Sequence, residues 1–411
     1  MRTNKLTYVN VFTIICCILF LAFLIGLHLD PNGVQRQIFF AGMNDFFADF
    51  FNVLRYIAER DPYFNPINGY GEKGYLPLTY LILYPFSQLD NYNVMTLQET
   101  WNSKMGVMSL FLFIGFSVFM LIFSLKKIVN KYNLSPILLL GLVLSYIFFF
   151  SIERGNTIIL TASFTGLFLC YYDSIDRTER IIAIMSLALA VTIKVYPVLF
   201  GFLYFEKKQY REIFLSAGLT LIFIFIPFLF FKREFANIPQ FINNVWLNTE
   251  AYSIHRIYPR FNLSHILYRF LIKINISDGI EGIYNISKIL TIIASLASVI
   301  FSVFIKNKWL KISLLTLTLV FLPVNSALYC GLYIFPMIIL FFATINERTK
   351  IFNIFILIVF IILLNPFQIG YKNYIFANIA LLSLWLVLLI ISGKHILIKL
   401  IKQRVCKLNK E

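Results

Sequence analysis

The chain has 411 residues, of which 59% are hydrophobic and 14% are charged, and its mean hydropathy is +0.78. Soluble globular domains average about 45–50% apolar and about 25% charged residues, so this composition excludes a soluble enzyme, a disulfide-rich secreted domain and a disordered protein. The net charge of +16 comes from basic residues scattered between apolar runs, which excludes a nucleic-acid binder and leaves a polytopic helical membrane protein.

The first apolar run, residues 8–28, follows a start that carries Arg2 and Lys5. It is too long for the apolar region of a signal peptide, and no A-x-A cleavage site follows it. We therefore expect an uncleaved membrane anchor. Further spans are expected near 103–125, 134–151, 157–172, 212–231, 284–305, 311–327, 330–345, 351–367 and 374–393.

Residues 181–205 decide the predicted topology. One long helix would cross the membrane once, whereas two short helices meeting at Lys194–Pro197 would return the chain to the side it came from. Lys and Arg collect in cytoplasmic loops, and only the two-helix form places the basic loops on one side. We therefore predict two helices. The basic residues then assigned to the cytoplasm are Lys126, Lys127, Lys131, Arg177, Arg180, Lys207, Lys208, Arg211, Lys306, Lys308, Lys311, Arg348, Lys350 and those of the tail.

This topology gives an all-α polytopic membrane protein with about 12 transmembrane helices. Residues 1–411 form one integral membrane domain, and both termini are cytoplasmic in a multi-pass protein of the cell membrane. Amphipathic juxtamembrane helices are expected in the first outer loop. The regions outside the spans are the first extracytoplasmic loop at 29–102, the second large extracytoplasmic loop at 232–283 and the basic cytoplasmic tail at 394–411.

The two short helices of 181–205 are expected to place Lys194 deep in the protein, toward the outer side. Each would be only about 18–20 Å long, less than the roughly 30 Å apolar core of a bilayer. Broken backbone is tolerated there only where protein or a cavity surrounds it. An intramembrane charge is usually functional, so Lys194 is a candidate site residue. A lysine that extends its charge toward the membrane surface is the alternative.

The segment 41–64, AGMNDFFADFFNVLRYIAERDPYF, is expected to form an amphipathic helix in the first outer loop. Asn44 can cap its start, and it should end near Arg60, because the residue before Pro62 avoids helical geometry. The residues expected to bury into the membrane interface are Phe46, Phe47, Phe50, Phe51 and Leu54.

One face of this helix is expected to carry Asp45 and Asp49 and to continue with Asn52 and Tyr56. Two like charges four residues apart are normally unfavourable, so a protein accepts them for solvation, for cation binding or for catalysis. A solvated polar face and a catalytic site both remain open. The apolar segment that follows at 75–86, YLPLTYLILYPF, is too short to span and fits a re-entrant or juxtamembrane helix.

An acidic residue soon after the first span, an amphipathic stretch ending in Asp61-Pro62-Tyr63, a Gly-rich turn at 68–74 and the helix at 75–86 together resemble glycosyltransferases of the GT-C fold. The chain most resembles glycosyltransferase family 87, a polyprenol-phosphate-dependent, mannosyltransferase-like family that is often described only as a domain of unknown function. The resemblance covers about residues 8–345.

Three further stretches are similar to motifs of that family. Phe150–Asn156, followed by TIILTASFTGLFL, is similar to its G-x-x-N motif, and Thr192–Pro197 is similar to its Lys-x-x-Pro motif. Asn262–Ser264 with Arg269 is similar to its Asn-x-Ser…Arg motif. The chain departs from the family at Pro323–Tyr329, where members commonly carry a His-containing motif and this sequence has no His.

The resemblance implies a hexosyltransferase that moves a sugar, with mannose as a candidate, from a polyprenyl-phosphate donor to a glycan or glycolipid acceptor on the outer face. Such a reaction needs a carboxylate that deprotonates or orients the acceptor hydroxyl. By spacing to Asp61-Pro62-Tyr63, Asp45 matches that carboxylate better than Asp49. The expected partners are the donor, the acceptor and membrane lipid, with no nucleic acid.

The same resemblance implies cationic groups for the donor phosphate, with Arg preferred for its bidentate geometry. No cofactor is expected: no spacing supports a metal site, and dependence on a divalent cation stays open. The candidates for the donor phosphate are Lys194, Arg256, Arg260 and Arg269, and those for substrate binding are Glu153, Arg154, Asn156, Tyr196, Asn262 and His265.

Simpler roles are open for several of these residues. The arginines of the second outer loop can instead belong to a solvated or headgroup-contacting loop, and Glu153 can pair with Arg154. Two other functions also fit many spans and large outer loops. A lipid-linked sugar transporter or flippase would tend to show inverted repeats with paired broken helices, of which only one is evident. A polysaccharide polymerase would depend on loop arginines more than on a first-loop Asp.

Overall fold

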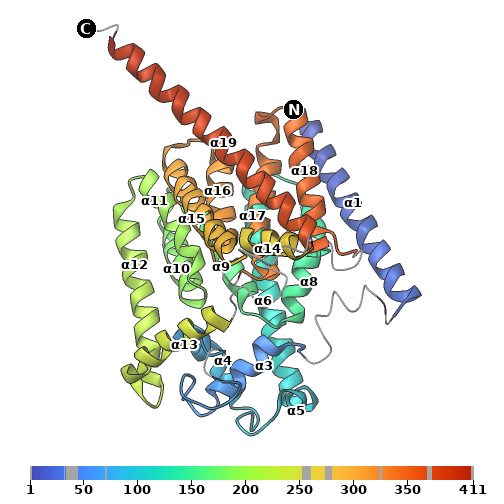
Figure 1. The fold of residues 1–411 in the computed structure, drawn as a ribbon, viewed down its shortest axis with the longest axis vertical. Helices are drawn as coiled ribbons and strands as arrows, with labels where there is room; N and C mark the ends of the chain where they lie inside the picture. Colours follow the sequence, from blue (N-terminus) through green and yellow to red (C-terminus); the bar gives the residue numbers. More distant parts are fainter. Residues whose placement is uncertain are drawn as a thin grey trace.

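The computed structural model describes residues 2–31, 33, 45–69, 72–251, 261–273, 280–323, 326–367 and 373–408. Regular structure in these residues is helical, and they contain no strand, which confirms the predicted all-α class. The helices form a bundle with shorter helices gathered at one end (Figure 1).

Five helical segments among the described residues are long and apolar enough to cross a membrane: Lys5–Leu29, Lys104–Lys131, Tyr210–Phe230, Glu281–Phe304 and Ile375–Lys399. They belong to α1 (Arg2–Leu29), α6 (Lys104–Lys131), α12 with η2 (Tyr210–Phe225 and Ile226–Phe230), α15 (Ile280–Phe304) and α19 (Asn373–Leu408). Shorter apolar segments are α9 (Ile158–Tyr171), η4 with α17 (Leu328–Tyr333 and Ile334–Ala343) and α18 (Lys350–Leu364).

The segment 134–151, expected to be one span, is interrupted. It forms α7 (Ile137–Val143) and α8 (Tyr146–Glu153), because the Ser145 side chain accepts the backbone N–H of Phe148 and starts a new helix. This corrects the single helix predicted there.

The predicted break at Lys194 is confirmed. α10 (Arg177–Ile193) ends directly before Lys194, whose backbone is extended, with φ of −141° and ψ of 125°. Pro197 cannot donate a helical hydrogen bond, and the chain continues as two short helices. These are η1 (Tyr196–Gly201) and α11 (Phe202–Glu206).

The interior of the bundle is formed by short helices that are buried on all sides. Every residue of α17 is buried, and so is almost all of α16 (Lys308–Phe321). α1, α12 and α15 instead expose many Leu, Ile and Phe side chains outward, as expected for helices that face lipid. Full burial explains why the central helices lack the one-sided apolar pattern of helices at a soluble surface.

The two ends of the bundle are formed by different elements. α1 begins and α19 ends toward one end, whereas α3, α4, α5 and α13 lie at the other (Figure 1). Asp173 forms ion pairs with Lys131 at 3.1 Å and with Lys308 at 2.6 Å, and Glu206 pairs with Lys311 at 2.6 Å. Lys131 comes from one predicted cytoplasmic loop and Lys308 and Lys311 from another, and their ion pairs with Asp173 and Glu206 join these loops to the ends of α9 and α11.

The amphipathic helix of the first outer region is present as α3 (Ala48–Ile57), shorter than predicted. Phe47 has a left-handed φ of 51°, which is incompatible with a right-handed helix. The helix therefore begins after Phe47, and Asp45 precedes α3 and does not lie on it. The proposed cap, Asn44, lies outside the described residues.

The apolar face of α3 packs against the protein itself, which corrects the prediction that its phenylalanines enter the membrane interface. Phe50, Phe51 and Leu54 are fully buried in a cluster that includes Tyr80 and Phe113. The shorter helices around this cluster and elsewhere are α4 (Pro77–Ser87), α5 (Leu97–Asn102), η3 (Glu234–Ala236), α13 (Asn237–Ala251), α14 (Leu263–Lys273) and η5 (Ile345–Glu347).

Candidate active site

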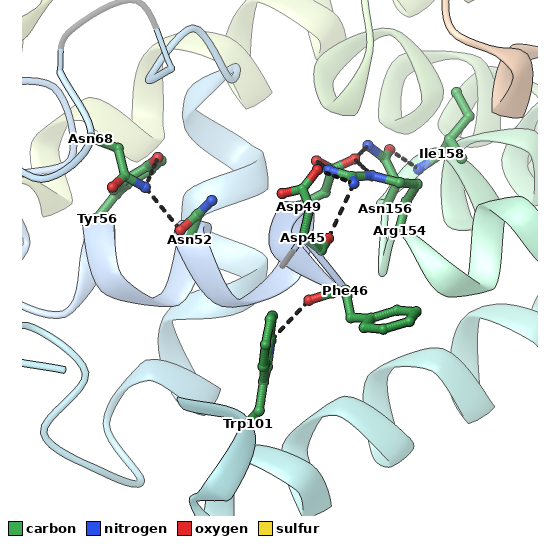
Figure 2. Close-up of polar contacts among 10 residues, drawn as sticks. All are labelled: Asp45, Phe46, Asp49, Asn52, Tyr56, Asn68, Trp101, Arg154, Asn156 and Ile158. Carbon is green, nitrogen blue, oxygen red and sulfur yellow. Dashed lines mark hydrogen bonds and ion pairs between the residues drawn. The ribbon is translucent and has the colours of Figure 1, made fainter. Parts of the chain in front are cut away.

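Two acidic residues of the first outer region converge on one arginine. Arg154, just after α8, contacts Asp45 Oδ2 through Nη1 at 2.5 Å and Asp49 Oδ1 through Nη2 at 2.8 Å (Figure 2). Its Nη1 also donates to the Asp45 backbone carbonyl at 3.1 Å. The guanidinium therefore compensates the repulsion between the two carboxylates and fixes their separation.

The two carboxylates have different surroundings. Asp49 accepts a second hydrogen bond, at 2.6 Å, from the Asn156 side-chain amide, and its side chain is 18% exposed. Burial alone would raise the pKa of Asp49, but the charge of Arg154 and the hydrogen bonds from Arg154 and Asn156 hold that pKa below its usual value. The Asp45 side chain is 51% exposed. Asp45 is therefore the more accessible proton acceptor.

The turn that carries Asp45 is fixed from two sides. The Phe47 backbone N–H donates to the Glu153 carbonyl at 2.9 Å. The Trp101 indole N–H, from α5, donates to the Phe46 carbonyl at 2.9 Å. Because the two residues that follow Asp45 are both hydrogen-bonded to other parts of the chain, its carboxylate is positioned without belonging to a helix.

Gly155 and Asn156 explain why the predicted motif at 150–156 has these residue types. Gly155 has φ of +62°, and a Cβ there would lie 2.8 Å from Cβ of Phe50, so α3 can pack this closely only against glycine. Asn156 Oδ1 accepts the backbone N–H of Ile158 at the start of α9, while its amide donates to Asp49. The motif thus joins α3 to the α8–α9 turn.

Glu153 does not pair with Arg154, which corrects one alternative left open by the sequence. It is 3% exposed, and neither of its carboxyl oxygens has a hydrogen-bond partner among the residues the structure describes. Burial raises the pKa of Glu153 to about 8, with smaller contributions from Asp49 and Asp45, against the opposing charge of Arg154. Glu153 therefore holds its proton to a higher pH than an ordinary carboxyl group.

Lys194 lies within electrostatic reach of Asp49 and forms no ion pair with it in the described structure. Its Nζ is 5.0 Å from the ring centre of Tyr75 and 5.9 Å from that of Tyr329, within the range of cation–π contact. It interacts electrostatically with Asp49. In the described part of the chain no carboxylate forms an ion pair with Lys194, so its charge is available to an anion.

A model of glycosyltransferase family 87 matches residues 75–328, which include Arg154, Asn156 and Lys194. The chain belongs to glycosyltransferase family 87. It is therefore a membrane glycosyltransferase. Asp45 and Asp49 precede the matched residues and are joined to them through Arg154. A comparison with curated proteins gave no match.

Among the described residues of this glycosyltransferase, Tyr196 and Asn262 form no hydrogen bond with the two carboxylates, and the remaining predicted site residues have side chains outside the described set. Tyr196 begins η1 and packs on the main hydrophobic cluster. Asn262 is buried, and its side chain accepts the Ser264 backbone N–H at 2.7 Å, which starts α14. His265 and Arg269 belong to α14, with side chains outside the described set, and Arg256 and Arg260 are not described at all.

Sequence patterns did not single out the aromatic residues of the candidate site. Tyr75 and Tyr329 flank Lys194, and Trp101 holds the turn of Asp45. Tyr75 opens the 75–86 segment, where proline and aromatic residues gave a usable signal. Tyr329 lies in an apolar stretch of the sequence and Trp101 in a polar one, and neither stretch has a distinctive pattern. Among the described residues, no group of three His, Cys, Asp or Glu side chains is placed to bind a metal.

Proposed function

We propose that this glycosyltransferase moves a hexose, with mannose as the first candidate, from polyprenyl phosphate to a hydroxyl of a glycan or glycolipid on the extracytoplasmic side of the cell membrane. The proposal rests on a pair of carboxylates and a free positive charge that lie within electrostatic reach of each other. Arg154 holds a carboxylate pair, and Lys194, within electrostatic reach of Asp49, keeps an uncommitted positive charge.

In the proposed reaction, Asp45 accepts the proton of the acceptor hydroxyl while that oxygen attacks the anomeric carbon of the donor sugar. A new glycosidic bond forms, the bond from the sugar to the phosphate oxygen breaks, and polyprenyl phosphate leaves. Asp49 acts through Arg154 and keeps Asp45 in place, because its own carboxylate already accepts from Arg154 and Asn156.

Lys194 is proposed to balance the negative charge that grows on the departing phosphate. A preplaced cation in surroundings of low polarity stabilises such charge strongly, because no solvent has to reorganise. Tyr75 and Tyr329 surround the ammonium and limit its hydration. Arg256, Arg260 and Arg269 remain proposals as further phosphate contacts, and Glu153, Tyr196, Asn262 and His265 as contacts to the substrates.

The sidedness of this proposal rests on the distribution of charge. Lys131, Lys308 and Lys311 form ion pairs between loops predicted to be cytoplasmic, and Asp45 lies in the predicted first outer loop. We retain the proposal of about 12 crossings in a GT-C arrangement with both termini cytoplasmic. In it, short buried helices such as α16 and α17 cross within the bundle.

No cofactor is proposed for the transfer. Arg154 already supplies a positive charge between Asp45 and Asp49, and the Asn156 amide turns a hydrogen-bond donor toward Asp49. Because Arg154 compensates the charge of the two carboxylates, they do not need a divalent cation for that purpose.

The test incubates the purified protein in lipid nanodiscs with polyprenyl-phosphate mannose, glucose and galactose and with a set of octyl glycosides as acceptors. We expect release of free polyprenyl phosphate and one added sugar on the acceptor with at least one donor, and nothing with protein-free nanodiscs. Movement of intact lipid-linked sugar across vesicles without new glycoside would contradict transfer and indicate a transporter. A long ladder of products would indicate a polymerase instead.

A further inference from the structure

The polar face of α3 continues beyond the carboxylates into a group of neutral side chains. Asp49, Asn52 and Tyr56 are spaced three and four residues apart and therefore share one face of the helix. Asn68, from the turn after α3, lies against this face and donates to Asn52 Oδ1 at 2.9 Å and to Tyr56 Oη at 3.1 Å (Figure 2). We refer to Asn52, Tyr56 and Asn68 as the amide strip.

The hydrogen bonds inside the strip leave a donor group on Asn52 and an acceptor group on Asn68 free, whereas the third member, Tyr56, is buried. Asn52 Oδ1 accepts from Asn68 and also from Arg55 Nη1 at 3.0 Å, so its amide NH₂ is the unused part of the side chain. The Asn68 amide NH₂ is used twice, so its carbonyl oxygen is unused. Within the described residues neither unused group has a hydrogen-bond partner, although Asn68 is exposed and Asn52 is half-buried.

The strip is also rigid. Asn65 closes the turn by donating through its amide to the backbone carbonyls of Tyr56 at 2.9 Å and Asp61 at 3.1 Å. The buried Lys73 lies under the Tyr56 ring and donates to the Asn65 carbonyl. Asn68 itself has a left-handed φ of 56°, a conformation that asparagine tolerates better than most residues. Its side chain is thus placed before any ligand arrives.

We propose that the amide strip binds the acceptor, and that the acceptor is an uncharged sugar presenting two neighbouring hydroxyls. Each hydroxyl can donate and accept, so one hydroxyl accepts from Asn52 while the next donates to the Asn68 carbonyl. The three side chains of the strip are themselves uncharged, and the neighbouring Arg55 directs Nε to the Met95 carbonyl at 2.9 Å and Nη1 to Asn52, so an uncharged acceptor fits the strip best.

The position of the strip suits an acceptor because it adjoins the proposed base. From Asp49 to Tyr56 the helix rises by about 10 Å, so a sugar bound along the strip extends toward the carboxylates. A further hydroxyl of the same sugar residue is then directed to Asp45. This inference rests on the proposed function and adds the part of the protein that selects the acceptor.

The test compares Asn68→Gly with wild type for transfer from polyprenyl-phosphate mannose to octyl mannoside and octyl glucoside. Glycine suits the positive φ, so the variant removes the amide without backbone strain. Asn133→Gly is the matched control, because Asn133 also has a left-handed φ, of 49°, at the other end of α6. Asn52→Ala is the second variant, since Arg55 keeps its contact with Met95.

We expect the acceptor KM to rise about five- to tenfold in Asn68→Gly and in Asn52→Ala, as the loss of one or two neutral hydrogen bonds predicts. The maximal rate and the hydrolysis of donor without acceptor should stay within twofold, and Asn133→Gly should match wild type. Saturation-transfer NMR measures binding of the same octyl glycosides without turnover, and octanol serves as the acceptor without a diol.

Unchanged acceptor KM and unchanged glycoside binding in both strip variants would overturn the inference. Equal binding of octanol and octyl glycosides by wild type would overturn it as well. If wild type released no polyprenyl phosphate from any donor but bound the glycosides through the strip, the proposed donor chemistry would fail while the acceptor site remained.

Discussion

Three carboxyl groups lie near the guanidinium of Arg154, and their surroundings assign them different tasks. Asp45 keeps an exposed side chain, Asp49 is fixed by two donors, and Glu153 is buried without a partner in the described structure. One cation cannot compensate three nearby negative charges at once, so the buried group is the one that keeps its proton. Sequence spacing singled out Asp45 and Asp49 but gave no means to tell Glu153 from a paired residue.

Glu153 makes the stability of the protein depend on pH. Its pKa rises from 4.5 to about 8 on folding, so the folded protein retains a proton that the unfolded chain has lost. Stability therefore falls as pH rises through this interval and is lowest above it. We expect Glu153→Gln to unfold at a higher temperature than wild type, with a gap that widens by several degrees between pH 5 and pH 8.

Thermal unfolding in detergent at four pH values measures this gap, with Glu347→Gln, a variant at the opposite end of the bundle, as the control. A gap that stays constant with pH would show that Glu153 is ionised in the folded protein.

Lys194 is the second residue with a separable role. Because its charge is proposed to meet the donor phosphate, we expect Lys194→Gln to raise the donor KM about ten- to a hundredfold, the range for a lost charge-assisted hydrogen bond. The acceptor KM should change less than threefold. Initial rates with each substrate varied in turn measure both. An equal rise in the two KM values would point to a general loss of structure.

At the scale of elements, the site depends on how closely α3 approaches the turn between α8 and α9. Gly155 allows that approach through its positive φ and its lack of a side chain. We expect Gly155→Ala to reduce stability by about 1–3 kcal/mol, from backbone strain and the contact with Phe50. Thermal unfolding tests this, with Gly218→Ala as control because a Cβ on Gly218 meets no atom within 4 Å. Equal unfolding temperatures would contradict close packing at Gly155.

Helix boundaries could be predicted where neighbouring residues determine them, and less well where contacts between residues distant in the chain determine them. The break at Lys194 followed from charge and from Pro197, and α3 followed from its amphipathic pattern. The start of α3 did not, because Phe47 is turned out of the helix by its bond to the Glu153 carbonyl, about a hundred residues away in the chain. The Ser145 cap that divides α7 from α8 is a local signal that the strong apolar run obscured.

At the scale of the whole molecule, composition was enough to predict a helical membrane protein. Composition could not predict which helices are long. The central helices are short because they are buried inside the bundle, and the thickness of the lipid layer does not set their length. α17 is apolar throughout and ten residues long, and no hydropathy profile distinguishes its surroundings from a membrane. The pairing of Arg154 with two acidic residues about a hundred positions earlier was likewise beyond spacing arguments.

The proposed topology predicts opposite labelling of two exposed loops. Val94 is 77% exposed in the first outer region, and Ile175 is 97% exposed between α9 and α10. In a Cys406→Ser background, we expect Val94→Cys to react with a membrane-impermeant maleimide in intact cells and Ile175→Cys to react only after permeabilisation. Cys16, Cys170 and Cys330 are buried, Cys17 is half-buried in the apolar helix α1, and the parent Cys406→Ser protein measures any labelling of these four. Labelling of both variants from outside would contradict the assigned sidedness.

The central claim is that Asp45 acts as the base in transfer from a lipid-linked sugar, and its most direct test is the rate of polyprenyl-phosphate release by Asp45→Asn. The variant keeps the size and hydrogen-bonding shape of the side chain but cannot accept the proton. We predict a fall in kcat of about 10²–10⁴-fold with an unchanged unfolding profile, while Asp90→Asn, whose carboxylate contacts Ser103, keeps wild-type activity. Wild-type rates in Asp45→Asn would contradict the account.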